Sequence, residues 1–276
     1  MRRISLLKIL ILLIYGLYMS NPLYCNEEKG RNDSGCIGLR FNNGRFKIVQ
    51  FTDLHWINGW NQTNDSTIAL MKTVISREHP DLVIITGDVV VSSGAEKGWE
   101  EVTKPMIEAK VPFAITFGNH DPESDMTKVQ ILKKLQSIPY NETYNADNRI
   151  SGVGNCVLPI MSSDKKHVKW LLYLFDSHDY TKNRMFGYYD WIKNDQIQWY
   201  RKTRDNYINR TKKILPSLAF FHIPLPEYTQ GLNMVSVIGN KKEDVCSPNI
   251  NSGLASAFIE KRDMLGVFTG HDHNND

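Results

Sequence analysis

The chain has few cysteines, and none of its four stands in a Cys-x-x-Cys pair. Structural zinc sites use such closely spaced pairs, so a zinc-thiolate site is not expected. An exported chain can form disulfides, and we expect Cys156 to pair with Cys246, because Cys36 lies in a polar lead-in. Internal repeats and low-complexity tracts are also absent, which excludes solenoid and propeller architectures.

An excess of basic charge is missing from most of the chain. The formal net charge is +3, and Arg2, Arg3 and Lys8 account for all of it, because residues 1–25 hold no acidic residue. The remainder is neutral and has no basic stripe. It therefore lacks the electrostatic footprint of a nucleic-acid-binding protein.

Long apolar runs are confined to the start of the chain. Residues 4–19 are apolar apart from Ser5 and Lys8, and they follow two arginines. This order is typical of a secretory signal peptide, and the apolar core is short of the about 20 residues that span a membrane as a helix. We expect residues 1–25 to be a signal peptide of a secreted or periplasmic protein, without stable membrane association after cleavage. An uncleaved signal anchor is the alternative.

If the chain is exported, its Asn-x-Ser/Thr sequons are potential glycosylation sites. In a eukaryotic secretory pathway these asparagines can carry glycans, which would make the protein a glycoprotein, whereas in a bacterium they would have no such role. The sequons are at Asn32, Asn61, Asn64, Asn141 and Asn209.

Apolar runs alternate with amphipathic segments over the rest of the 276 residues, as in one large α/β domain. The first half reads strand, helix, strand, helix, strand, which predicts parallel strands with crossover helices. The second half begins with two sequential strands, so two half-sheets packed face to face, with helices outside, fit the order. Strands are expected at 46–52, 82–86, 113–117, 155–160, 169–175, 217–221 and 265–269, and helices at 67–78, 99–109, 128–136, 194–207 and 254–261.

Acidic residues and histidines gather directly after five of these strands. Because ligands of such sheets bind beyond the carboxyl ends of strands, the five clusters are expected to converge on one cleft. Each cluster alone has an ordinary explanation as a turn, a helix cap or a core histidine, but the ordered set favours a metal site. The clusters are Asp53-Leu54-His55, Gly87-Asp88, Gly118-Asn119-His120-Asp121, His222 and Gly270-His271-Asp272-His273.

The residue types in these clusters suit two metal ions. Asp53 and His55 are separated by one residue at a strand end, so their side chains point to the same side and can share an ion. The carboxylate of Asp88 has two oxygens and can bridge two ions. Asn119 offers an amide oxygen, which suits the harder divalent metals.

The ordered set D-x-H, G-D, G-N-H-D, H and G-H-x-H resembles that of the calcineurin-like metallophosphoesterases, from about residue 45 to residue 276. The segments DLHW at 53–56, FHIPLPEY at 221–228, NSGL at 251–254 and GHDHNND at 270–276 are similar to its secreted, purple-acid-phosphatase-like branch. The resemblance implies an α/β fold, a four-layer αββα sandwich of two mixed β-sheets flanked by helices, in residues 45–276. A flexible lead-in at 26–44 precedes it.

The resemblance also implies roles for individual residues. His120 would contact the scissile phosphate and either protonate or stabilise the leaving oxygen, and Asp121 would orient His120. Purple acid phosphatases have a tyrosinate ligand three residues after the bridging aspartate, where this chain has Val91, so a metal-loaded sample is not expected to be purple. One metal would be held by Asp53, His55 and His273, the other by Asn119, His222 and His271, with Asp88 between them.

The implied activity is that of an exported phosphoester hydrolase with two divalent or mixed-valence ions (Fe, Mn, Zn or Co) and a metal-bridging hydroxide as nucleophile. Monoesters are favoured, in a phosphorylated small molecule or a phosphoprotein. One alternative is a phosphodiesterase or nucleotide hydrolase with the same site, and another is a catalytically silent binding protein. Because members of the family continue past the last histidine motif, we also expect a C-terminally truncated domain whose final strands are missing.

Two further segments have open interpretations. His178 and Asp179 follow the strand expected at 169–175, where they either edge the cleft or form a polar turn. The aromatic run at 186–191 either lines a substrate wall or packs in a loop.

Overall fold

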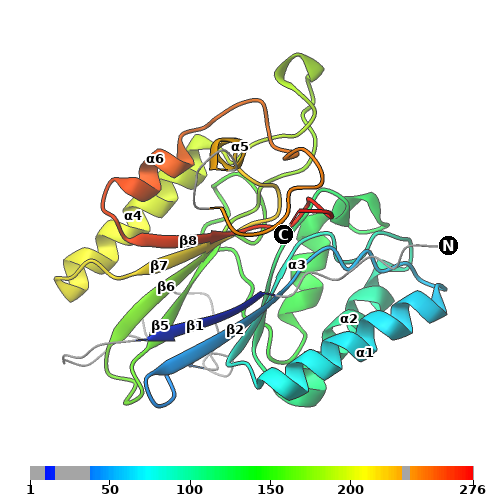
Figure 1. Ribbon diagram of the computed structural model, residues 1–276, viewed down its shortest axis with the longest axis horizontal. Coiled ribbons are helices and arrows are strands. Elements are labelled where there is room, and N and C mark those ends of the chain that lie inside the picture. The colour runs from blue at the N-terminus through cyan, green and yellow to red at the C-terminus, as the bar shows by residue number, and fades with distance from the viewer. Residues whose placement is uncertain (1–9, 16–37, 232–236, 276) are drawn as a thin grey trace.

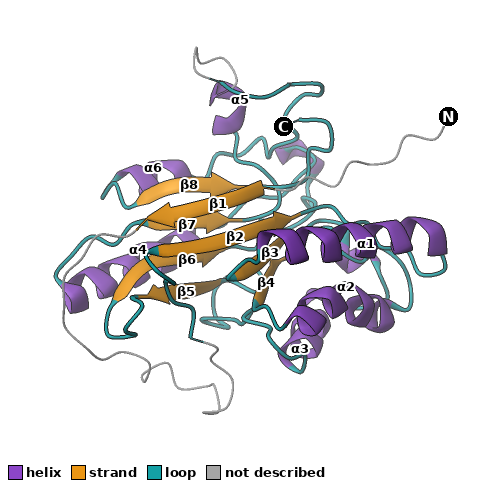
Figure 2. Cartoon of the chain, turned by 60° about the horizontal axis from the view of Figure 1, so that its bottom comes forward, coloured by secondary structure: helices purple, strands orange, loops and turns teal. Residues whose placement is uncertain are grey.

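The computed structural model describes residues 10–15, 38–231 and 237–275, which form two sheets packed face to face between layers of helices (Figures 1 and 2). Helices α1 (Asn61–Glu78), α2 (Ala95–Ala109) and α3 (Lys128–Gln136) cover the first sheet, and α4 (Asn194–Thr211) and α6 (Leu254–Ile259) cover the second. The predicted four-layer αββα sandwich is confirmed. The first sheet consists of β1 (Leu10–Tyr15), β2 (Arg45–Phe51), β3 (Leu82–Thr86) and β4 (Phe113–Thr116), and the second of β5 (Cys156–Met161), β6 (Val168–Leu174), β7 (Ser217–Phe220) and β8 (Met264–Phe268).

Strand direction places the ends of the strands that carry the clusters at one edge of each sheet. Strands β2, β3 and β4 are parallel, with α1 and α2 as the crossovers between them. In the second sheet β6, β7 and β8 are parallel, and β5 pairs with β6 in the antiparallel direction expected of sequential strands. The chain therefore leaves β2, β3, β4, β7 and β8 at the carboxyl edges, where each cluster begins.

The alternation of side chains along β3 explains its continuous apolar run. Leu82 and Ile84 pack into the cluster between the two sheets, while Val83 and Ile85 pack against the helices of the first sheet. Both faces of the strand are buried, as is usual for parallel sheets covered by helices. A third cluster, which includes Tyr200, joins the second sheet to α4 and α6.

Two helices begin earlier than their apolar spacing predicts. Helix α1 begins at Asn61 because its first turn is polar yet anchored: Asn64 is buried, and its Nδ2 donates to the Ile57 carbonyl at 2.7 Å. Helix α2 begins at Ala95, where the remote carboxylate of Asp125 accepts the backbone N–H groups of Gly94 and Ala95 at 2.9 Å each. Short α5 (Glu227–Gly231) was not predicted.

The end of the expected lead-in belongs to the folded domain, which corrects that part of the prediction. Leu39 and Phe41 are buried between the sheets, and Phe41 N–H donates to the Met161 carbonyl at 2.9 Å. Leu39 and Phe41 alternate with polar residues, and the surrounding segment is so polar that this alternation did not indicate a buried segment.

Strand β1 lies within the segment expected as a signal peptide and pairs antiparallel with β2. The rest of residues 1–25 lies outside the described part of the chain, and the signal peptide stays a prediction. None of the helices among the described residues is long and apolar enough to cross a membrane.

The predicted disulfide is wrong. Cys156 is buried in β5, whereas Cys246 is exposed in a loop, and the two are not joined by a disulfide. Cys36 lies outside the described residues.

Candidate metal centre

The strand ends bring six of the predicted ligands into two compact groups. Within each group, one potential ligand atom of every residue lies within 4.8 Å of the others. The first group draws on the ends of β2 and β8, and the second on the ends of β3, β7 and β8. The groups are Asp53 with His55 and His273, and Asp88 with His222 and His271.

Strained backbone sets the direction of four of these side chains. Asp53 (φ 53°), His55 (φ 46°), Asp88 (φ 51°) and His271 (φ 75°) all adopt the left-handed conformation, which is uncommon outside glycine. Such strain persists where the surrounding structure enforces it, and it is concentrated at functional sites. The chain therefore bends sharply after β2, β3 and β8, where these four ligands lie.

Close approach of the loops also requires glycine. A Cβ atom at Gly118 would lie 2.1 Å from Asp88 Oδ1, and one at Gly270 would lie 1.9 Å from Thr52 Oγ1. Gly118 and Gly270 thus have a packing reason that is independent of chemistry.

Asp88 belongs to the second group and also faces the first, as a bridging ligand must. Its Oδ2 is 3.0 Å from His222 Nε2 and 3.8 Å from His55 Nε2, and so faces a ligand of each group. Its Oδ1 accepts the backbone N–H of His120 at 2.8 Å, which holds the carboxylate in place.

Hydrogen bonding selects the nitrogen that His222 presents to the site. Its Nδ1 lies 2.7 Å from the Thr86 carbonyl, an acceptor, so Nδ1 carries the hydrogen and Nε2 is left for a ligand. On the other side of the site, His273 Nε2 lies 3.2 Å from Asp53 Oδ1.

The electrostatics favour a cation. Burial opposes the ionisation of Asp88, but the charge of His222 offsets it and lowers the pKa of Asp88 to about 2. Burial likewise lowers the pKa of His222, and the two carboxylates Asp88 and Asp53 overcome it, raising that pKa to about 9. Without a metal ion, a proton on His222 supplies the positive charge that balances the carboxylates. A divalent ion would supply this charge instead, because metal binding displaces such protons.

Four buried atoms of predicted ligands lack hydrogen-bond partners among the described residues. They are Asp53 Oδ1, His55 Nε2, the amide Oδ1 of Asn119 and His271 Nε2. A buried polar atom without a partner costs about 1–3 kcal/mol, and a cation removes that cost. Carboxylate and amide oxygens and imidazole nitrogens of this kind fit divalent metal ions.

His120 has a different partner from the predicted one. Its Nδ1 lies 2.6 Å from Glu123 Oε2, in the short 3₁₀ helix Asp121–Glu123. The proposed orienting contact from Asp121 is wrong, because Asp121 is fully buried and its oxygens accept backbone N–H groups instead. These belong to Asp88, Val89, Val90 and Gly118, at 2.7–3.3 Å. Asp121 therefore shapes the Asp88 loop, and Glu123 orients His120.

We predict that Glu123→Gln lowers kcat about tenfold while metal content stays unchanged. A hydrogen bond to a charged group contributes about 1.5–3 kcal/mol. Glu123 is half-exposed, so solvent screening puts the contribution of its bond to His120 at the low end of this range. Steady-state kinetics with metal analysis checks this. Asp121→Asn is the contrasting variant, which should instead reduce metal content by loosening the Asp88 loop. Equal kcat for wild type and Glu123→Gln would contradict the orienting role.

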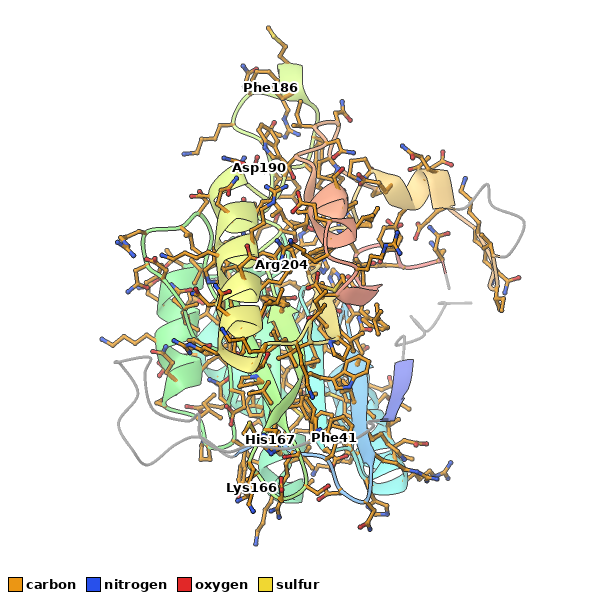
Figure 3. The ribbon with its side chains drawn as sticks, turned by 90° about the vertical axis from the view of Figure 1, so that its left-hand side faces the viewer. Phe41, Lys166, His167, Phe186, Asp190 and Arg204 are labelled. Atoms are coloured by element: carbon orange, nitrogen blue, oxygen red, sulfur yellow. The ribbon has the colours of Figure 1, made fainter. Side chains whose placement is uncertain are left out.

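A tyrosine-rich hairpin at residues 179–190 stands over the site and was only partly foreseen. Tyr180 and Tyr189 form an antiparallel bridge, and Tyr189 packs edge-on against His271 with ring centroids 4.6 Å apart. Burial raises the pKa of Tyr189 to about 12. His178 takes the polar-turn interpretation, since its Nε2 contacts Gln196 Oε1 at 2.8 Å. Phe186 is exposed at the hairpin tip, at the end of the molecule opposite His167 (Figure 3).

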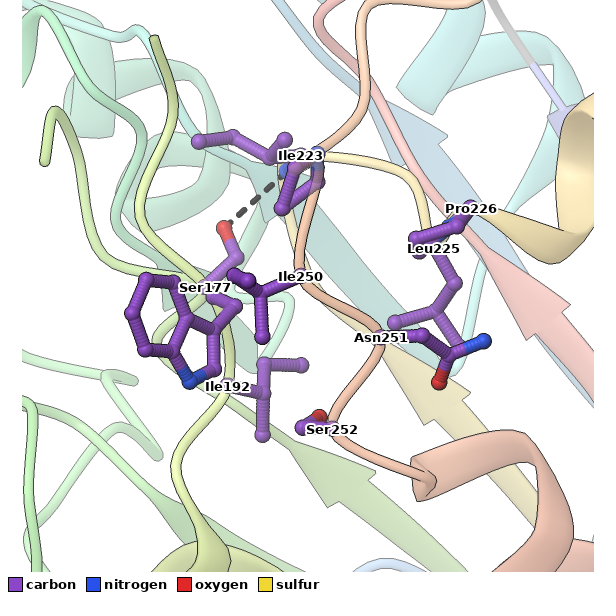
Figure 4. Close-up of a pocket in the computed structure, with 10 residues that line it drawn as sticks. Ser177, Ile192, Ile223, Leu225, Pro226, Ile250, Asn251 and Ser252 are labelled. Carbon is purple, nitrogen blue, oxygen red and sulfur yellow. Dashed lines mark hydrogen bonds between the residues drawn. The ribbon is translucent and has the colours of Figure 1, made fainter. Parts of the chain in front are cut away.

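A small cavity beside the site is too narrow for a substrate. Its volume of about 10 Å³ is close to the minimum that one water molecule needs. Ile223 N–H donates to Ser177 Oγ at its wall, and Ile192 and Ile250 lie alongside (Figure 4). A substrate-sized ligand therefore does not fit in this cavity.

The chain is similar in sequence to several known proteins. The chain is 34% identical over 279 residues to "Probable inactive purple acid phosphatase 14" of Arabidopsis thaliana, an alignment that covers 88% of this chain and 70% of that protein. It is 32% identical over 270 residues to "Probable inactive purple acid phosphatase 29" of the same plant, covering 86% and 69%. It is also 34% identical over 265 residues to "Phosphatase DCR2" of Saccharomyces cerevisiae, covering 84% of this chain and 45% of that protein.

Residues 46–275, nearly the whole described domain, match the family described as "Calcineurin-like phosphoesterase". The chain therefore belongs to the calcineurin-like phosphoesterase family, in its purple-acid-phosphatase-like branch.

Proposed function

We propose that the chain is an exported phosphoester hydrolase with two metal ions, drawn from Fe, Mn, Zn and Co, that prefers phosphate monoesters to diesters. The observation that supports it most is that Asp88 Oδ2 faces His222 of its own ligand group and His55 of the other group. Membership of the phosphoesterase family supports the reaction class. Export is inferred from the basic and apolar start of the chain.

The residues of the site have distinct tasks in this reaction. Two bound divalent ions supply Lewis-acid charge and a nucleophile derived from water at neutral pH. Asp53, His55 and His273 would hold one ion, Asn119, His222 and His271 would hold the other, and Asp88 would contribute to both. His120, with Nδ1 engaged by Glu123, offers Nε2 to protonate the leaving oxygen.

We predict that His120→Ala leaves both ions bound and lowers kcat about 10²-fold, the low end for general acid catalysis, with p-nitrophenyl phosphate as substrate. The p-nitrophenolate group leaves readily without a proton, so the loss should be larger with an alkyl phosphate. Metal analysis beside kinetics on both substrates measures this. A defect explained by metal loss, or the same loss for both leaving groups, would contradict the proton-donor role.

The assay that tests the function compares p-nitrophenyl phosphate with bis(p-nitrophenyl) phosphate, before and after chelation and with Mn²⁺ returned. We expect two metal ions per chain, loss of hydrolysis on chelation, recovery with Mn²⁺ and a higher kcat/KM for the monoester. Faster hydrolysis of the diester would favour a phosphodiesterase instead.

A catalytically silent binding protein is the second candidate, because two relatives carry "inactive" in their names. Those names concern the relatives, and in this chain every ligand position of the motif is present. Tight binding of two ions with turnover of neither ester would favour this candidate.

A further inference from the structure

The hydroxyl of Tyr180 contacts a predicted metal ligand from outside the metal groups. Asn119 Nδ2 donates to Tyr180 Oη at 2.9 Å, across 61 residues of sequence. Asn119 is almost fully buried at 1% exposure, so this partner is not replaceable by bulk water. The Tyr180 ring also packs edge-on against His120, with centroids 6.3 Å apart.

This contact decides which end of the Asn119 amide faces the metal site. An amide presents a donor NH₂ on one side and an acceptor oxygen on the other, and its orientation follows from its hydrogen-bond network. With Nδ2 engaged by Tyr180, Oδ1 is the free end, and it is buried without a hydrogen-bond partner among the described residues. A flipped amide would turn its NH₂ toward a cation, where it cannot bind.

The charge of a second neighbour favours the acceptor role of the Tyr180 hydroxyl. A hydroxyl can donate or accept, so it would not by itself choose between the two ends of the amide. The negative charge of Glu123 acts on the same hydroxyl and favours a proton directed toward that carboxylate, so the oxygen accepts from Asn119 Nδ2. Glu123 also contacts His120, so a single carboxylate lies behind both side chains.

We propose that Tyr180 is a positioning residue that fixes the Asn119 amide with Oδ1 toward the ion held by His222 and His271. This inference rests on the proposed two-metal function. The Tyr180–Glu123 pair would thereby couple the orientation of a metal ligand to that of the proton donor His120.

The test is metal binding by Tyr180→Phe, which keeps the ring and removes only the hydroxyl. Loss of a partner behind a metal ligand costs about 10–100-fold in affinity, so we expect one of the two ions to bind that much more weakly and the other to bind as in wild type. Tyr188→Phe is the matched control, because Tyr188 is 53% exposed on the same hairpin and packs against the Tyr180 ring. The melting temperature of the metal-free protein should be the same in all three.

A double variant isolates the role of the amide. Asn119→Asp presents an oxygen in either orientation, so Tyr180→Phe added to it should cause no further loss of affinity. A full additional 10–100-fold loss in the double variant would overturn the amide-orienting role.

Several outcomes separate this inference from the proposed function. Absence of metal binding in wild type would contradict the proposed function itself. Two ions bound equally well by wild type and Tyr180→Phe would contradict only the positioning role of Tyr180. A higher KM with unchanged metal affinity would place the hydroxyl on the substrate. A strong visible tyrosinate-to-iron band in Fe-loaded wild type, lost in Tyr180→Phe, would make Tyr180 a ligand and overturn the positioning role.

Discussion

Asp88→Asn is expected to abolish phosphoester hydrolysis and to lower metal content more than any other single ligand change. Asp88 Oδ2 faces ligands of both groups, so its charge serves both ions. Charge stabilisation by the metal ions amounts to several kcal/mol, which corresponds to a fall in kcat of at least about 10³-fold. Asparagine tolerates the left-handed backbone at this position, so the variant should fold.

Metal analysis, kinetics and thermal melting of the metal-free protein measure this result. Asp65→Asn, an exposed residue of α1, is the control and should behave as wild type. Two ions per chain with near-normal turnover in Asp88→Asn would disprove the bridging assignment, and with it the site as described.

Most of the site could be predicted because its signal is local. The LVIIT run followed by Gly87-Asp88 marks both a buried strand and the residue that leaves it, and each other cluster repeats this arrangement. Parallel strands then bring these ends to one edge without further information. The strand positions and the two ligand groups follow from that single rule.

What the sequence could not indicate are partners that meet only in space. Asp121, adjacent to His120, was the natural orienting residue, yet Glu123 faces the imidazole because the 3₁₀ turn carries it there. Tyr180 and Asn119 come from different sheets, and no spacing links them. Asp125 caps α2 from a distant loop, so the start of that helix had no local signal.

Another contact of this kind is a buried ion pair behind the site. Lys128, at the start of α3, donates to Asp176 Oδ1 at 2.9 Å just after β6, and the two side chains are 9% and 2% exposed. Asp176 also accepts the backbone N–H groups of His178 and Val153, so it anchors the turn that leads into the tyrosine hairpin. Burial opposes both charges, but each partner overcomes it: the pKa of Lys128 is raised and that of Asp176 is lowered.

Lys128→Met should therefore destabilise the fold severely at neutral pH. Removing one partner of a buried pair leaves an uncompensated charge, at a cost of about 3–5 kcal/mol. For a domain of this size that corresponds to a fall in melting temperature of about 6–20 °C. Lys133→Met is the matched control on the same helix, where an exposed lysine should change stability by no more than about 0.5 kcal/mol.

The pH dependence distinguishes loss of the ion pair from loss of packing. In wild type the lowered pKa of Asp176 contributes stability above its unfolded value of about 3.9, and this contribution is lost as pH falls through the folded pKa. In Lys128→Met the cation is gone, so burial raises the pKa of Asp176. The carboxyl group of Asp176 is then protonated at a higher pH than in wild type, and this protonation removes the uncompensated buried charge. The gap in unfolding free energy between wild type and variant should thus be widest near neutral pH and narrow as pH falls toward 4. A gap that stays constant with pH in chemical denaturation would assign the defect to packing of the lysine stem, and equal stability at pH 7 would show that the pair contributes nothing.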